Sequence, residues 1–104
     1  MDKIKKDGKV AVLISPGYGA GWSSWADFDQ RDTLCMDARI VKPVLDGNIK
    51  RAVEIAKELF PDLYTGGAET LEVEWVEEGS RFEIDEYDGS ESIHIIGQHN
   101  YMVA

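Results

Sequence analysis

The acidic residues of this chain are concentrated in one stretch. Ten of the 20 acids lie between Glu69 and Glu91, where Arg81 is the only base, so this stretch carries the whole formal net charge of −9. Carboxylates at this density can attract a basic protein, and several that converge can bind a divalent cation. Which of these they do depends on which acids share a face.

The acids alternate with apolar residues and are divided by turn signals, so we expect antiparallel β-strands. Two-residue turns at Glu78-Gly79 and Asp88-Gly89 would join residues 71–77, 81–87 and 92–96 into a meander. This register collects apolar side chains on one face of the sheet. On the other face it collects the residues of a predicted acidic face: Glu72, Glu74, Glu83, Asp85 and His94.

The register also sets Glu74 opposite Glu83 and Glu72 opposite Asp85, and such like-charged pairs destabilise a sheet. Three interpretations of the acidic face remain open. It can be a solvated surface that keeps the protein soluble and blocks edge pairing. It can bind a basic protein, including one whose normal ligand is nucleic acid, by imitating phosphates. A cation site is the third, but a flat sheet seldom encloses an ion and no calcium-loop spacing is present, so we expect no metal.

A second candidate site is the loop that follows the apolar segment Lys9–Ser15. Its glycines could leave backbone N–H groups free for an anion, and its aromatic rings could stack on a base. Neither the dinucleotide-binding pattern nor the P-loop pattern is present. The glycines could equally serve tight turns while the Trp residues close a small core. The candidate binding residues of this Gly/Trp loop are Tyr18, Gly19, Gly21, Trp22 and Trp25.

Catalysis has little support in the sequence. The serines near the loop lack the G-x-S-x-G context of a hydrolase nucleophile. Cys35, His94 and His99 show no spacing that favours a catalytic or metal-binding set. We therefore expect a non-enzymatic protein with no catalytic residues and no cofactor.

These candidate residues must be positioned by a small α+β fold. The unbroken apolar run Lys9–Ser15 predicts a strand buried on both faces. Asp37 could cap a short helix, and Asn48 could cap the main amphipathic helix, residues 48–60. We predict a single domain, residues 1–104, with a mostly antiparallel sheet of four to five strands and this main helix packed on one face.

Composition sets further limits. Apolar residues make up 43% of the chain, as in globular proteins. A single cysteine excludes an internal disulfide, and the longest apolar run is too short to span a bilayer. The charged start of the chain does not resemble a signal peptide. We therefore expect a cytoplasmic protein that binds no membrane and, because of its negative charge, no nucleic acid directly.

Three segments together resemble a family of short, uncharacterised proteins of phages and bacteria: VAVLISPGYGAGWSSW, YTGG and LEVEWVEEGSRFEIDEYDGSESI. No activity of that family is established, so the resemblance implies only context, a small accessory protein that acts on a host component. The predicted function is a binding protein that engages a host protein, basic or nucleic-acid-binding, through the acidic face and the Gly/Trp loop. The alternative is a pocket for a nucleotide-like small molecule in residues 16–34, completed at a homodimer interface.

Overall fold

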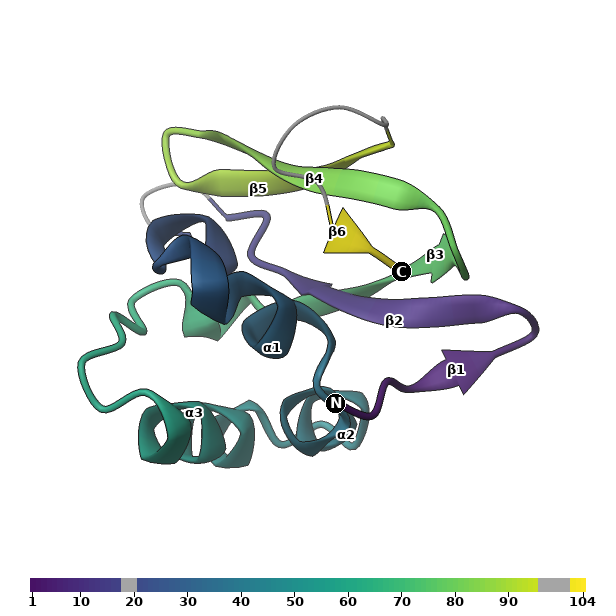
Figure 1. Cartoon of the computed structure of the whole chain (residues 1–104). Helices are drawn as coiled ribbons and strands as arrows, with labels where there is room; N and C mark the ends of the chain where they lie inside the picture. The colour runs from purple at the N-terminus through teal and green to yellow at the C-terminus, as the bar shows by residue number, and fades with distance from the viewer. Residues whose placement is uncertain (18–20, 96–101) are drawn as a thin grey trace.

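The computed structural model describes residues 1–17, 21–95 and 102–104 (Figure 1). Its strands are β1 (Lys5–Lys6), β2 (Lys9–Ile14), β3 (Glu72–Glu77), β4 (Arg81–Tyr87), β5 (Ser90–Ile95) and β6 (Met102–Val103). Its helices are α1 (Arg31–Met36), α2 (Ala38–Leu45) and α3 (Ile49–Leu59), and its 3₁₀ turns are η1 (Ser23–Trp25), η2 (Phe28–Gln30) and η3 (Ala68–Thr70). The predicted α+β class is confirmed.

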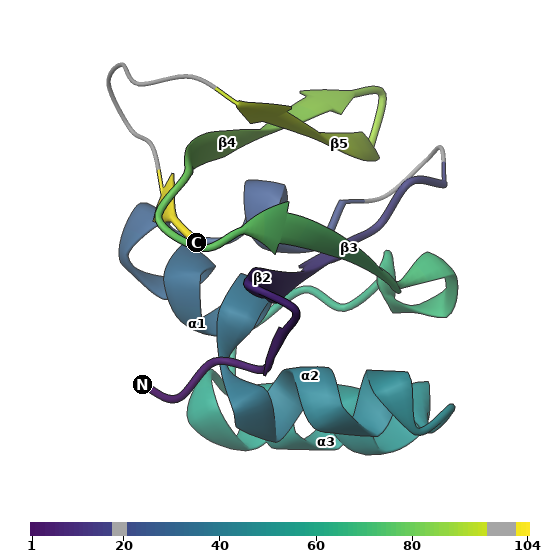
Figure 2. The same ribbon diagram turned by 90° about the vertical axis from the view of Figure 1, so that its right-hand side faces the viewer.

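The strands form two antiparallel sheets of three strands each, in the orders β1-β2-β3 and β5-β4-β6. The β4–β5 hairpin lies over one side of the first sheet, and α2 and α3 lie on its other side (Figures 1 and 2). The first sheet is therefore the middle layer of the fold. The prediction of a single sheet with one main helix is wrong, because the apolar residues are divided between two sheets and three helices.

Strand β2 belongs to both halves of the hydrophobic interior. Ala11 and Leu13 join the core on the helical side, and Val10 and Val12 join the core beneath the second sheet. All four side chains are fully buried. The predicted burial of this strand on both faces is confirmed, and β2 is the central strand of its sheet.

The first predicted hairpin is wrong, because β3 pairs with β2 and not with β4. Glu74 lies opposite Val12, and Glu72 lies opposite Ile14, so neither faces an acid of β4. The physical reason is that the buried backbone of β2 needs hydrogen-bonding partners along its length. Strand β1 pairs with only two residues of β2, whereas β3 pairs with all six residues of β2. The turn at Glu78-Gly79 carries the chain from one sheet to the other.

The second predicted hairpin is confirmed in its exact register. Glu83 pairs with His94 and Asp85 pairs with Ser92 across β4 and β5. Asp88 and Gly89 both have positive φ, 51° and 84°. These are the backbone conformations that a two-residue type I′ turn requires, and Asp-Gly adopts them readily.

Both predicted helix caps are confirmed. The side chain of Asp37 accepts a hydrogen bond from the Arg39 N–H at the start of α2, and Asn48 accepts one from the Arg51 N–H at the start of α3. The Arg39 side chain also donates to both oxygens of Asp37, which holds the pKa of Asp37 below its ordinary value. Of the predicted 16–34 loop, residues from Arg31 onward belong to α1.

The packing of α3 differs from the prediction. Ala52 and Ala56 of α3 are buried in the core on the helical side of the first sheet. The apolar side of β4 and β5 is covered instead by β2 and by α1, through Cys35 and Met36. Within the described ranges, no helix is both long and apolar enough to cross a membrane.

Candidate binding surfaces

The described part of the Gly/Trp loop is built around one buried carboxylate, that of Glu91 near the start of β5. Only 1% of Glu91 is exposed. Its Oε1 accepts a hydrogen bond from the Ser15 N–H (2.9 Å). Its Oε2 accepts from the backbone N–H groups of Trp22 (2.7 Å) and Ser24 (2.9 Å), and from the Ser24 hydroxyl (2.5 Å). The Glu91 N–H in turn donates to the Ser15 carbonyl, so this residue joins the second sheet to the end of β2.

This arrangement corrects the interpretation of the loop. Its backbone does present N–H groups to an anion, as the glycines of the loop suggested. The anion, however, is a side chain of the same protein. The N–H groups of Ser15, Trp22 and Ser24 are therefore occupied. Gly21 is buried beside them, whereas Tyr18 and Gly19 lie outside the described residues.

The sequence pattern did not single out Glu91, which was counted only as one of the ten acids of residues 69–91. The signal was present in the two-residue period of the strand. Every second residue of β5 points to the same side, so Glu91 lies on the apolar side with Ile93 and Ile95. Ser92 and His94 lie on the opposite side. An acid on the apolar side of an amphipathic strand predicts a buried carboxylate with specific donors.

The two Trp residues of the loop have different roles. Trp22 is fully buried, and its indole N–H donates to the Leu34 carbonyl (2.9 Å), so it is part of the core. Trp25 is 46% exposed and stacks on Tyr64, with ring centroids 5.5 Å apart. Its indole N–H donates to Oε1 of Glu86 on β4 (2.7 Å). Of these two Trp residues, only Trp25 is therefore available to a ligand.

The five residues of the predicted acidic face do not share one surface. Glu72 and Glu74 lie on β3 in the first sheet, whereas Glu83, Asp85 and His94 lie on β4 and β5 in the second. The alternation of β4 sends Phe82 into the core and leaves Asp85 on the outer side of the hairpin. The acids thus form two groups, one on each sheet.

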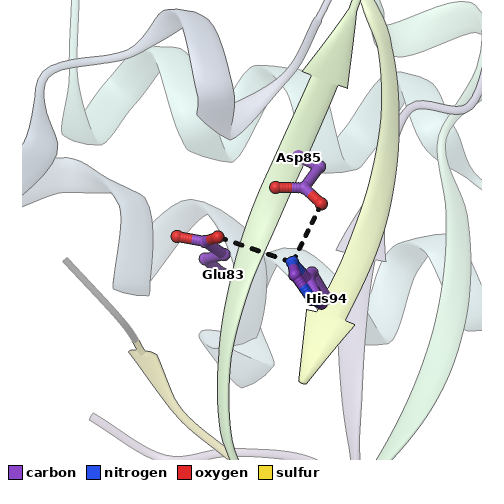
Figure 3. A group of neighbouring side chains, drawn as sticks. All are labelled: Glu83, Asp85 and His94. Atoms are coloured by element: carbon purple, nitrogen blue, oxygen red, sulfur yellow. Dashed lines mark ion pairs between the residues drawn. The ribbon is translucent and has the colours of Figure 1, made fainter. Parts of the chain in front are cut away.

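On the outer side of the hairpin, His94 lies between two carboxylates (Figure 3). Its Nδ1 is 3.2 Å from Asp85 Oδ2 and 3.6 Å from Glu83 Oε1. One ligand atom from each of the three residues lies within 4.8 Å of the others, close enough for one metal ion. His94 and Asp85 are exposed to solvent, and direct contacts of the imidazole with the two carboxylates account for the same geometry. The cluster by itself therefore defines no metal site.

A groove of about 380 Å³ lies between β3 and β5, which are outer strands of their sheets in the described part of the chain. Glu74, Val76 and Glu77 of β3 line it together with Ile93 and Ile95 of β5, and Lys9 of β2 is the one basic residue among the described lining residues. Ile95 is 56% exposed. The groove thus combines carboxylates with accessible apolar side chains.

Cys35 is closed to nucleophilic chemistry. The thiol is fully buried in the core between β2 and β4 and lies 3.0 Å from the Ser23 hydroxyl. Burial, which disfavours the thiolate, raises its pKa from 9.0 to about 12. The neutral thiol is therefore the form present at physiological pH, and it is a poor nucleophile.

Comparison with known proteins gives no match to a family model, to a curated protein or to a solved structure.

Proposed function

We propose that this protein is a small, non-enzymatic binding protein that engages a basic protein partner, with β3 and the adjoining groove as the main contact. The observation that carries the proposal is the state of the β3 carboxylates. Glu72, Glu74 and Glu77 are all exposed on an outer strand, and none takes part in an ion pair or side-chain hydrogen bond within the described residues.

The charge balance favours a cationic partner. Of the ten acids between residues 69 and 91, only Glu91 is buried. The remaining nine stand at or near the surface with Arg81 as the single base of the stretch. Surfaces of one sign accelerate association with partners of the opposite sign and disfavour others.

The groove favours an extended segment of the partner. An outer strand leaves one row of backbone N–H and C=O groups unpaired, to which a peptide can add as a further strand. Beside that edge, Ile93 and Ile95 offer apolar contact while Glu74 and Glu77 offer charge. A segment in which basic and apolar side chains alternate matches both features.

The Gly/Trp loop contributes less to this proposal than the sequence indicated. The backbone N–H groups of Ser15, Trp22 and Ser24 are bonded to Glu91, which weakens the support for a nucleotide-like ligand. The resemblance to phage and bacterial proteins leads us to include an accessory role, directed at a host protein in the cytoplasm, in the proposal.

The test is capture from host extract by immobilised variants, with each captured protein then measured as a purified component. Glu72→Lys with Glu74→Lys should abolish binding of the partner, and binding by the wild type should weaken steeply as salt is raised. Glu83→Lys with Asp85→Lys reports whether the acids of β4 also contact the partner. Because these acids lie on the second sheet, their effect can be measured separately from that of the β3 acids.

The matched control is Glu54→Lys with Glu58→Lys on the exposed side of α3, which changes the net charge by the same amount. Equal loss of binding in this control would show a non-specific charge effect and contradict the proposal. If the β3 variant keeps its partner but self-associates, the acids serve only to block edge pairing.

A further inference from the structure

The exposed ring of Trp25 belongs to a pocket that no function assigned above uses. The pocket has a volume of about 310 Å³ and lies between residues 25–30 and residues 59–64. Two aromatic rings, Trp25 and Tyr64, are 46% and 54% exposed there. Where several segments of a chain expose large aromatic side chains at one place, that place commonly has a binding role.

Two contacts fix the position of Trp25. Its ring stacks on Tyr64 at an interplanar angle of 26°, and its N–H is held by Glu86 Oε1. The same oxygen accepts a hydrogen bond from the Gly89 N–H, which ties Glu86 to the β4–β5 turn. The indole is therefore presented in one orientation before any ligand arrives, which lowers the entropic cost of binding.

The chemistry of the lining favours a cation. Asp27 and Asp62 line the pocket with the aromatic rings, and none of its described lining residues is Lys or Arg. Aromatic faces attract cations through their quadrupole, with Trp the strongest, and nearby carboxylates add to that attraction. The same electrostatics disfavour a phosphate or other anion.

A cation–π contact already occurs next to the pocket, between Phe28 and Arg31. The Arg31 guanidinium lies over the ring of Phe28, 5.6 Å from the ring centroid. Phe28 is exposed and belongs to η2, which connects Trp25 to α1.

We propose that the pocket formed by Trp25, Tyr64, Asp27 and Asp62 binds an organic cation of the guanidinium or alkylammonium type. The site shares no residue with β3 or its groove, so this inference stands or falls independently of the proposed function. The cation can be a side chain of a protein or a free small molecule, since both present the same chemistry.

The experiment follows the three indole N–H signals of the ¹⁵N-labelled protein by NMR, with that of Trp25 assigned through Trp25→Phe. Choline and N-acetyl-arginine-methylamide are the probes, and 3,3-dimethylbutan-1-ol is the uncharged analogue of choline. We expect a saturable shift of the Trp25 signal with either cation, at dissociation constants on the order of millimolar, and little change at Trp22 and Trp75. Equal binding of the uncharged alcohol would overturn the inference, as would no shift with either cation.

Matched variants separate charge from packing. Asp27→Asn with Asp62→Asn should weaken cation binding about five-fold or more, whereas Asp29→Asn, an exposed acid outside the pocket, should not. Tyr64→Leu should abolish binding, whereas Tyr87→Leu, which removes a more exposed ring elsewhere, should leave it intact. If the controls weaken binding as much as the pocket variants, the site is wrongly assigned.

The source of the cation is decided by comparing affinities. A short arginine-containing peptide that binds at least ten-fold tighter than the single amino-acid derivative supports a protein side chain. Choline that binds more tightly than the peptide supports a free alkylammonium ligand. If none of these cations binds while partner binding at β3 is intact, this inference is overturned and the proposed function is not affected.

Discussion

Glu91 organises the Gly/Trp loop although its own side chain is buried. A carboxylate is costly to bury unless its oxygens are paired with donors. Glu91 meets this condition with three backbone N–H groups and one hydroxyl, all from residues 15–24. It therefore acts as an internal anion that shapes the loop and joins it to β5.

At this scale we predict that Glu91→Ala lowers the free energy of unfolding by about 3 kcal/mol or more. Three N–H donors, those of Ser15 and Trp22 buried and that of Ser24 partly buried, would lose their acceptor, at about 1–3 kcal/mol for each buried one. Glu91→Gln should cost less, because the amide oxygen can still accept. Urea denaturation followed by circular dichroism measures both variants.

The control for this prediction is Glu69→Ala, which removes an exposed acid of the same stretch and should change stability by no more than about 0.5 kcal/mol. A Glu91→Ala protein as stable as this control would show that the carboxylate is not needed to hold the loop.

At the scale of elements, the loop after β2 and the segment before η3 approach each other through two glycines. A Cβ at Gly67 would lie 2.3 Å from the carbonyl oxygen of Gly21 and 3.0 Å from the Ser15 hydroxyl. That hydroxyl already donates to the Gly67 carbonyl (2.9 Å). Gly67 is thus required by packing and not by its backbone angles, since its φ is −86°.

We predict that Gly67→Ala destabilises the protein by about 3 kcal/mol, because a backbone carbonyl cannot move aside as a flexible side chain could. Gly8→Ala is the comparison. Gly8 has a positive φ of 77° but open space around it, so this change should cost about 1 kcal/mol. Thermal denaturation would refute the packing argument if both variants had the same midpoint.

At the scale of the whole molecule, two cores meet at one strand. The core that contains Trp22 lies on the helical side of β2, and the core that contains Phe82 lies on its other side. The side chains of β2 alternate between the two cores. If β2 came away from one core, its side chains in the other core would become exposed as well. The two halves should therefore unfold together.

We predict that Val12→Ala shifts the unfolding midpoint measured by Trp fluorescence as far as the midpoint measured by circular dichroism. Val12 belongs to the core away from Trp22, so an effect on fluorescence requires coupling of the two cores. Leu13→Ala, on the Trp22 side, serves as the comparison and should cost about 2–5 kcal/mol. A fluorescence midpoint that does not move in Val12→Ala would show that the cores unfold independently.

The sequence by itself determined the features that depend on neighbouring residues. The caps at Asp37 and Asn48, the two-faced burial of β2, and the Asp88-Gly89 hairpin follow from local hydrogen bonding, periodicity and turn geometry. Each is fixed within a few residues, where propensity and pattern are reliable guides.

Only the tertiary structure decided how these elements are combined. The sequence pattern of β3 suits pairing with β4 and with β2 equally, and β2 prevails because its buried edge must be hydrogen-bonded. That choice divides the predicted acidic face between two sheets and leaves Glu74 and Glu77 of β3 beside a groove. The two-residue period of β5 places Glu91 on the apolar side, but which donors hold its carboxylate depends on contacts between residues far apart in the chain. The meeting of Trp25 with Tyr64 depends on such contacts as well.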